Sequence, residues 1–542
     1  MPTLKFYAIL KKYVGFLYKN RSIQVETRLQ KLFITHPTCV VYITTRPKKQ
    51  STFNEKMNEL SNTAKKPVIL VTLIEAGMGH IVSATAIADA LKVKYGDKVE
   101  VCDRHILRDS DSEVLHKYEQ FLVDNVKGYS KYPSFGYFQL FSMYILGPQN
   151  SLRFVHRTVM RKQVDALVAE YAKIKPDVIV ATHYYPLFCA VKYRNTHDKN
   201  VKVISYCPDN TVHGWWDARC DMMYTNNSIA TEQAYNLTFR SGRVCEAFYP
   251  TRKAVIDANE SKEFYREKFG IPQDKFAVVV ADGVYAEAKA KDICLELIES
   301  DLPLTVCLLA GKNEEIRQEF EQLKSTVKPN ITLLTFGFMS NAPELYKACD
   351  LFITKAGPNA ILDSVMMDTP VIVDFCATPI EYATKNLFTK NHLCGQFIAN
   401  PHKIKQQVEE YVLHPELLNE FSDSLQYFDK SKNGSEEIAD DIIEMLFDPK
   451  RHLDKHYEQE DAVIDRYFNE QAAKSNERYN EILNDGGKIS QKRERRIYKS
   501  ISATNFKYAK KASTLKRKFH SGKASKQYAS ILIKINENNQ GK

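Results

Sequence analysis

The sequence contains few features that would assign it at once to a special class of protein. No stretch of its 542 residues reaches the roughly 18 uninterrupted apolar residues that a membrane-spanning helix needs. Its 11 cysteines include no CxxC pair and no regular spacing, and Cys207 and Cys220 lack the partner pairs of a zinc site. We therefore expect reduced, mostly buried thiols in a cytosolic protein, with no metal and no other cofactor.

The N-terminus lacks the pattern of a signal peptide. The stretch "MPTLKFYAILKKYVGFLYKN" has an apolar and aromatic stripe that lysines interrupt, and no small-residue cleavage site follows it. It fits either a helix lying in a membrane surface or an ordinary amphipathic helix packed on the protein. Residues 1–66 show no clear domain pattern, so they are interpreted as a basic N-terminal extension, with Met57 as a possible alternative start.

The positive charge is concentrated at the C-terminal end. Residues 488–542 carry 16 Lys/Arg and two acids, a net of +14, against +10 for the whole chain, so the remainder sums to about −4. This composition predicts a basic, flexible tail that suits lipid headgroups or nucleic acid, or that is simply solvated. Five aromatic residues are interspersed and could lie at a lipid interface or stack on bases: Tyr498, Phe506, Tyr508, Phe519 and Tyr528.

Two sets of short apolar runs alternate with helical stretches. The first set is Val68–Leu73, Val99–Cys102, Val178–Ala181 and Val203–Tyr206. The second set is Phe276–Val280, Leu304–Leu309, Ile331–Thr335, Leu351–Thr354 and Val371–Asp374. Continuous apolarity predicts parallel strands covered on both faces, and the alternation predicts doubly wound α/β units. We expect two Rossmann-like domains that face a cleft.

The domain boundaries follow from composition. The stretch "FYPTRKAVIDANE" has a proline, charges and no strand pattern, so the first domain is placed at 67–255 and the second at 256–425. Residues 426–487 read as a helical segment, followed by the tail at 488–542. Within that segment, Ile438, Ile442, Ile443 and Leu446 share one helix face that we expect to pack on the body.

A glycine turn and a histidine follow the first apolar run. Gly77-Met78-Gly79-His80 stands where the strand gives way to small residues with helical spacing. Glycines let the backbone approach a ligand, and N–H groups at a helix start favour an anion. His80 could act as a general base on a hydroxyl, although a histidine after a glycine turn is often only a capping or hydrogen-bonding residue.

A second turn of the same kind follows Leu351–Thr354. It reads Lys355-Ala356-Gly357-Pro358-Asn359, and a helix carrying Asp363 in its first turn is expected next. Such a turn predicts a phosphate site, and Asp363 is a candidate ligand for ribose hydroxyls. The alternative is that Asp363 has only a structural role, as an acid at the helix N-terminus that the helix dipole stabilises.

These stretches together resemble a family of glycosyltransferases that includes monogalactosyldiacylglycerol synthases and bacterial processive diacylglycerol glucosyltransferases. The resemblance rests on "EAGMGHIVSATAI", Gly337-Phe338, "DLFITKAGP" and the acid Asp363, in the family's order over about residues 67–425. Between them, "KPDVIVATHYYPLFCAV" resembles the family's strand ending in Thr-His and a proline, and "ISYCPDNTVHGWW" resembles its strand ending in Asp, with His and Trp following.

The resemblance implies a GT-B fold and an inverting transfer from a UDP-sugar to a lipid hydroxyl, without an obligatory metal. It implies His80 as the base, Phe338 at the uracil, Asp363 at the ribose and the residues Lys355, Ala356 and Gly357 at the diphosphate. The other donor-side candidates are Gly79, Gly283, Pro358, Asn359, Glu381 and Asn386. The acceptor-side candidates are His183, Pro186, Asp209, His213 and Trp215.

The sequence departs from the family's pattern at three points, and these leave the donor sugar open. The family's helix usually carries Glu where Asp363 stands; "VVVADGVYAEAK" holds only Gly283; and no Gln precedes Glu381 in "TPIEYATKN". We expect transfer of glucose or galactose to diacylglycerol by a peripheral protein on the cytosolic, inner face of an anionic membrane. A UDP-GlcNAc-dependent transferase, an epimerase of similar architecture or a non-catalytic UDP-sugar-binding relative stays open.

The membrane contact has two candidate elements. The aromatic region Phe121–Leu146 either inserts into the interface or forms an ordinary hairpin that closes the core, and the basic tail adds attraction to anionic lipid. A nucleic-acid partner would explain the tail alone, so no specific nucleic acid is expected.

Overall fold

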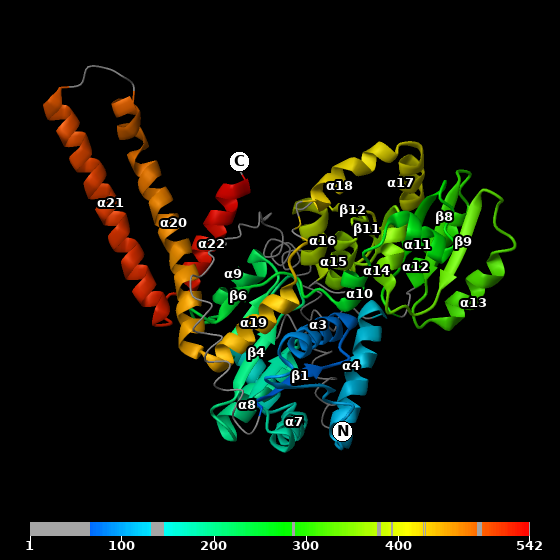
Figure 1. Cartoon of the computed structure of the whole chain (residues 1–542), viewed down its shortest axis with the longest axis horizontal. Coiled ribbons are helices and arrows are strands. Elements are labelled where there is room, and N and C mark those ends of the chain that lie inside the picture. Colours follow the sequence, from blue (N-terminus) through cyan, green and yellow to red (C-terminus); the bar gives the residue numbers. More distant parts are fainter. Residues whose placement is uncertain are drawn as a thin grey trace, which may run out of the picture. The chain divides into compact units, whose positions relative to one another are not determined.

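The computed structural model describes residues 66–131, 146–284, 288–376, 381–391, 394–426, 428, 430–484 and 490–540. Figure 1 labels its helices and strands. The N-terminal extension and most of the aromatic region Phe121–Leu146 lie outside the described residues, so the expectations for both stay predictions.

The first sheet has six parallel strands in the order β2-β1-β3-β4-β5-β6. They are β1 (Val68–Leu73), β2 (Glu100–His105), β3 (Val178–Ala181), β4 (Lys202–Tyr206), β5 (Met222–Thr225) and β6 (Val244–Glu246). Its helices are α3 (Met78–Tyr95), α4 (Glu113–Lys131), α6 (Pro148–Arg157), α7 (Arg161–Ile174), α8 (Tyr184–Thr196) and α9 (Ser228–Asn236). The four strands expected in this half are present, and β5 and β6 extend the sheet by two more.

The second sheet also has six parallel strands, in the order β12-β11-β10-β7-β8-β9. They are β7 (Phe276–Val280), β8 (Leu304–Leu309), β9 (Ile331–Phe336), β10 (Leu351–Thr354), β11 (Val371–Val373) and β12 (Gly395–Phe397). Its helices are α10 (Lys253–Asp257), α11 (Lys262–Phe269), α12 (Ala288–Ile298), α13 (Glu314–Leu323), α14 (Ala342–Ala348), α15 (Pro358–Met366), α16 (Glu381–Asn386), α17 (Pro401–Leu413) and α18 (Asn419–Leu425). The predicted fold class, two doubly wound α/β units as in the GT-B fold, is confirmed.

Helix α19 (Gly434–Phe447) returns the chain to the first unit. Its residues Ile438, Ile442 and Ile443 are fully buried in one core with residues of α3 and the first sheet, such as Ile87 and Val180. Leu446, the fourth member of the expected face, is partly buried against the same core. The helix therefore packs on the body as its periodicity predicts.

The expectation of a flexible C-terminal tail is wrong. The chain continues through α20 (Pro449–Asn484), α21 (Gln491–His520) and α22 (Ser525–Gln540), and α20 and α21 lie side by side (Figure 1). Four residues of α21 at helical spacing are buried: Ile497, Ala512, Leu515 and Phe519. Charge counting overlooked this apolar stripe, which supplies the burial that holds the helix in place.

The aromatic residues of this segment consequently divide into two groups. Phe519 and Tyr528 stack on each other and belong to the core of the first unit, so neither can meet a lipid or a base. Tyr508 is half-buried and shares a hydrogen bond with Ser475. Tyr498 and Phe506 are 55% and 72% exposed, so these two remain available to a partner. None of the described helices is both long and apolar enough to cross a membrane.

Candidate functional site

Each sheet has one place where the strand order reverses direction. In the first sheet this lies at β1 and β3, and in the second at β7 and β10. Ligands of doubly wound sheets bind beyond the carboxyl ends of the strands at such points. The turn Gly77–His80 follows β1 and the turn Lys355–Asn359 follows β10, so both sequence motifs stand at these positions.

The two turns meet at the N-termini of α3 and α15. A Cβ atom placed on Gly79, at the start of α3, would lie 2.9 Å from Nδ2 of Asn359, at the start of α15. A side chain on Gly79 would therefore displace the amide group of Asn359. Two motifs about 280 residues apart in the chain are thus brought into direct contact, as the hypothesis of a shared site requires.

No side chain caps either helix start, and because α15 begins with Pro358, which has no N–H, its first N–H group is that of Asn359. Each helix begins after a glycine, Gly77 for α3 and Gly357 for α15, and neither start has a side-chain cap or an acid in its first turn. Asn359 is buried, and neither its Nδ2 nor its Oδ1 has a hydrogen-bond partner among the described residues. Uncapped N–H groups and a buried, unpartnered amide at one place can bind an anion with hydroxyl groups.

Lys355 and Gly283 lie together beside this point. A Cβ on Gly283, which has a φ of +78°, would lie 3.3 Å from Cε of Lys355. Gly283 follows β7, the central strand of the second sheet, so the loop after β7 and the turn after β10 lie side by side. A lysine at this place supplies positive charge near the two helix N-termini, while Ala356 is buried and serves as packing.

The ring of His80 is held in one tautomer. Its Nδ1 lies 2.5 Å from the carbonyl oxygen of Thr182, and the Thr182 hydroxyl donates to the carbonyl of His80 at 2.8 Å. A carbonyl only accepts, so Nδ1 carries the proton and Nε2 is left with a lone pair. Burial lowers the pKa of His80 to about 4, so the ring is neutral near pH 7 and Nε2 can accept a proton.

Two further predicted residues, His183 and His213, surround His80. The rings of His80 and His183 meet edge to face with centroids 4.8 Å apart, and the ring of Tyr184 contacts His183 at a tilt and His213 edge to face. His183 caps α8 by accepting from the N–H of Tyr185. Its Nδ1 is therefore an acceptor, so His183 presents Nε2–H, a donor, where His80 presents an acceptor.

The remaining acceptor-side candidates differ in what they offer. Trp215 is 7% exposed and Pro186 is buried within α8, so both shape the site through packing. Asp209 follows β4 and is only partly covered, and burial raises the pKa of its carboxyl to about 7. Asp209 is thus a second group that could exchange a proton near neutral pH.

Asp363 lies in the second turn of α15 rather than the first, and its carboxylate is already bonded. It accepts from the Tyr249 hydroxyl at 3.0 Å and from Nε and Nη2 of Arg252 at 3.0 and 2.5 Å. Burial raises the pKa of Asp363, and the Arg252 guanidinium opposes that rise. The explanation of a first-turn acid favoured by the dipole is therefore wrong. Ribose binding by Asp363 stays a prediction, and Oδ1, which accepts only from Tyr249, is the oxygen with a lone pair left for a hydroxyl.

The other donor-side candidates lie on α16 and after β9. Asn210 donates to the Thr384 hydroxyl at 3.1 Å, which joins the loop after β4 to α16, the helix that carries Glu381 and Asn386. The Oδ1 of Asn386 is buried without a partner among the described residues. Phe338 is 52% exposed, and Nζ of Lys312 lies 5.7 Å from the centroid of its ring.

Sequence reasoning missed the residues that join the two units. Tyr249 and Arg252 stand in the stretch that was interpreted only as a domain boundary, and Asn210 follows the predicted Asp209 by one residue. Nothing in their spacing shows that they bond to α15 and α16. The signal that could have found Arg252 is the buried acid Asp363 itself, since a buried carboxylate needs a cationic partner.

The comparisons with known proteins agree with the resemblance. Residues 286–446 match the model of the glycosyltransferase family 28 C-terminal domain. The chain is 23% identical over 390 residues to the processive diacylglycerol beta-glucosyltransferase of Bacillus licheniformis, covering 71% of this chain and 96% of that protein. It is also 23% identical over 423 residues to monogalactosyldiacylglycerol synthase 2, chloroplastic, of Arabidopsis thaliana, covering 74% and 83%. The resemblance is confirmed.

Solved structures were compared as well. A crystal structure of MurG from Acinetobacter baumannii aligns with a TM-score of 0.44 at 12% identity, over 70% of this chain and 100% of that one. A crystal structure of UGT89C1 from Arabidopsis thaliana, complexed with UDP, aligns with a TM-score of 0.44 at 11% identity, over 70% and 100%.

The Arg252–Asp363 pair gives a stability prediction. Replacement of Arg252 by Met leaves a buried carboxylate without its cation, so we expect a loss of about 3–5 kcal/mol in the free energy of unfolding. Urea unfolding, followed by circular dichroism, measures this. The matched control is Lys253→Met, because Lys253 pairs with Asp257 at the surface, where such a pair is worth about 0.2–1 kcal/mol. Equal losses in the two variants would contradict the assignment.

Proposed function

We propose that this chain, a glycosyltransferase of the family 28 type, transfers a hexose from a UDP-sugar to the hydroxyl of a lipid, with diacylglycerol as the acceptor and glucose or galactose as the sugar. One observation carries the proposal: the uncapped N-termini of α3 and α15 meet at Gly79 and Asn359, and His80 stands in the same turn with Nε2 unprotonated.

The meeting of the two helices supports a diphosphate ligand. Each helix N-terminus carries about half a positive charge, and each offers backbone N–H groups without an internal partner. A diphosphate has oxygens enough for both helices and for Lys355. The same groups stabilise the charge that the leaving UDP gains when its bond to the sugar breaks, which lowers the barrier to transfer.

Direct displacement with inversion follows from this arrangement. The acceptor hydroxyl attacks the anomeric carbon while the bond from that carbon to the UDP oxygen breaks, and UDP leaves with the electron pair. His80 Nε2 takes the hydroxyl proton or positions the hydroxyl, and the carbonyl of Thr182 stabilises the resulting imidazolium through Nδ1–H. The Nε2–H of His183, next to His80, is available to orient the acceptor.

The choice of sugar is assigned to α16. Glu381 and Asn386 lie on this helix, and its bond to Asn210 links it to the loop of Asp209. A carboxylate accepts hydrogen bonds from sugar hydroxyls, and an amide can both accept and donate them. We therefore propose that these two residues distinguish one hexose from another. A UDP-GlcNAc-dependent transferase or epimerase, and a non-catalytic UDP-sugar-binding relative, are the alternatives that the donor experiment below separates.

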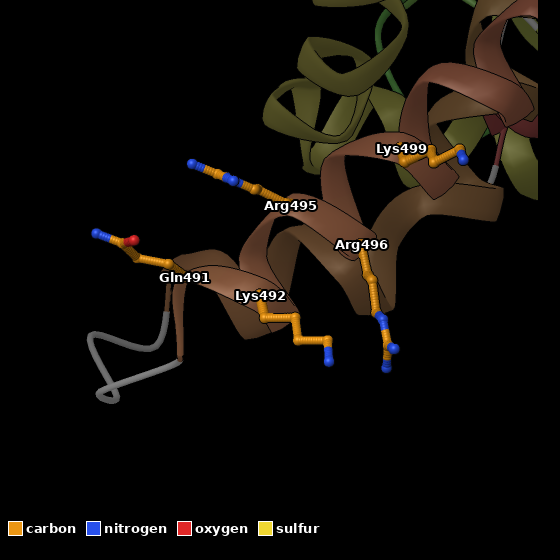
Figure 2. Close-up of a pocket in the computed structure, with 5 residues that line it drawn as sticks. All are labelled: Gln491, Lys492, Arg495, Arg496 and Lys499. Atoms are coloured by element: carbon orange, nitrogen blue, oxygen red, sulfur yellow. The ribbon is translucent and has the colours of Figure 1, made fainter.

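A lipid acceptor requires contact with a membrane, and α21 offers a face for it. Four basic residues lie on one side of the start of α21, where two arginines stand three or four positions from each of two lysines: Lys492, Arg495, Arg496 and Lys499. Figure 2 shows their side chains projecting from the helix. All four are exposed, and no ion pair joins any of them to a described residue. Phe506, seven residues after Lys499, falls on the same face, opposite the buried stripe of α21.

A basic face with one exposed aromatic is typical of a helix that lies on anionic lipid. Each charge near such a surface contributes about 1 kcal/mol to binding at moderate salt. We therefore propose that the protein binds peripherally to an anionic membrane on its cytosolic face, with α21 as a contact element and with no specific nucleic acid as partner.

The proposed activity predicts a lipid product that depends on one donor. Purified protein is incubated with anionic vesicles that contain diacylglycerol and, in turn, UDP-glucose, UDP-galactose and UDP-GlcNAc. We expect glycolipid and UDP to appear together with glucose or galactose, and His80→Ala to lower kcat at least a hundredfold, about the contribution of a general base. The control is His402→Gln, an exposed histidine on α17. UDP binding without product or UDP release would favour the non-catalytic alternative.

The pH profile of the same assay separates His80 from Asp209 as the base. A base must be deprotonated in the free enzyme, so kcat/KM falls as the pH drops through its pKa. With His80 as the base the fall lies near pH 4, and kcat/KM stays level between pH 6 and pH 8. A fall near pH 7 would assign the proton to Asp209 instead.

The basic face of α21 gives a prediction for membrane binding. Replacing Lys492, Arg495, Arg496 and Lys499 together by Gln removes four charges, so we expect the vesicle partition coefficient to fall at least tenfold at low salt. Sedimentation with vesicles that contain anionic lipid measures it. Transfer to a soluble acceptor analogue should persist, because the face lies outside the transfer site.

The control removes the same number of charges from the second unit. Lys324, Lys328, Lys403 and Lys405 are replaced together by Gln, and binding should then change little. An equal loss of binding in both variants would mean that net charge, rather than the face of α21, holds the protein on the membrane.

A further inference from the structure

We propose that Asp441, His452 and His456 bind one divalent transition-metal ion, with Zn²⁺ as the ion that the donor set fits and water as the fourth ligand. The three residues belong to α19 and α20, away from the helix N-termini of the transfer site, and the proposal does not depend on the transfer reaction. The expectation of no metal, drawn from cysteine spacing, did not consider this histidine pair.

The two histidines stand four residues apart on α20, so their rings project from the same face. Both direct Nε2 at one atom: Oδ2 of Asp441 lies 2.8 Å from Nε2 of His452 and 3.0 Å from Nε2 of His456. The three ligand atoms lie within 4.8 Å of one another. Two imidazole nitrogens and a carboxylate oxygen that converge in this way form the donor set of many zinc sites.

The environment of Asp441 favours a metal over a simple ion pair. Its Oδ2 also accepts from the Tyr224 hydroxyl at 2.8 Å, so three groups approach an oxygen that has two lone pairs. Nε2 of His456 lies 3.2 Å from Oδ1 as well, so this imidazole is shared between the two oxygens. One metal bond from Oδ2, with both imidazoles bound to the metal, removes this crowding. The other oxygen, Oδ1, accepts from Nζ of Lys455 at 2.8 Å, which is the outer contact that holds a monodentate carboxylate in place.

Burial and charge agree with this assignment. The side chains of Asp441, His452 and His456 are between 2% and 6% exposed, and a buried charged cluster needs its charges balanced. Lys455 also pairs with Glu444, so its charge is matched within the cluster. Zn²⁺ prefers four ligands, so a water molecule completes the set of two imidazoles and one carboxylate.

The ion would join two helices and hold them on the first sheet. Asp441 lies on α19 and the histidines on α20, and Asp441 also accepts from Tyr224 of β5. The ion binds the folded arrangement and not the unfolded chain, so it stabilises the packing of α19 and α20 on the first unit. This is a structural role, so the site can be tested without an activity assay.

The first experiment measures metal content in the full chain, purified without a polyhistidine tag and incubated with Zn²⁺ before gel filtration. Elemental analysis should find one zinc per chain. His452→Gln and His456→Gln should each lower that content severalfold, while the matched control His402→Gln, an exposed histidine on α17, should keep it.

The second experiment replaces Zn²⁺ by Co²⁺ in the wild-type chain. A tetrahedral site of two imidazoles, a carboxylate and water gives strong visible d–d absorption and no sulfur-to-cobalt band. His452→Gln and His456→Gln should each lose that absorption. Absorption of octahedral cobalt alone would contradict the proposed geometry.

If the variants fail to fold, the metal site can still be tested by the thermal stability of the wild-type chain. Chelation of the ion should lower the melting temperature by several degrees, and added Zn²⁺ should restore it. A folded wild-type chain that retains far less than one zinc per chain, with a melting temperature that neither chelator nor Zn²⁺ changes, would overturn the proposal. Asp441, the two histidines and Lys455 would then be an ion-pair cluster only.

Discussion

The meeting of the N-termini of α3 and α15 is the constraint on which the rest of the molecule depends. Each terminus carries a partial positive charge, so their approach at Gly79 and Asn359 is unfavourable unless an anion lies between them or near them. The fold therefore holds two like-charged helix ends together and leaves their N–H groups uncapped. This arrangement lowers the stability of the free protein, and a bound diphosphate would relieve the repulsion. The site therefore favours an anion independently of its catalytic residues.

The contacts that oppose this repulsion come from outside both turns. Arg252 and Tyr249, in the connection between the two sheets, bind Asp363 of α15, and Asn210 binds Thr384 of α16. Helix α19 then carries the chain back from the second unit into the core of the first. The chain crosses between the units twice, and each crossing makes buried contacts, so the separation of the two helix ends is fixed by packing and hydrogen bonds at several points.

The sequence predicts the repeating parts of this structure and misses the contacts between distant segments. Nine apolar runs predict nine of the twelve strands, because continuous apolarity is a local property. The other three, β5, β6 and β12, are short and contain no run of aliphatic residues, so they give little signal. The turns at His80 and Asn359 are found for the same reason. The bond between Arg252 and Asp363 depends on how the units are arranged, and the burial of Phe519 is hidden in a strongly basic segment. Composition describes the exposed face of α21 and not its buried stripe.

The most direct test of the account is amide hydrogen exchange with and without UDP, with uridine as the ligand that lacks the diphosphate. If the two helix N-termini share one diphosphate, UDP slows exchange at Met78–Ile81 and at Asn359–Ile361 together, and uridine leaves the first of these segments unchanged. Protection of only one segment, or of neither, would contradict a diphosphate held between α3 and α15.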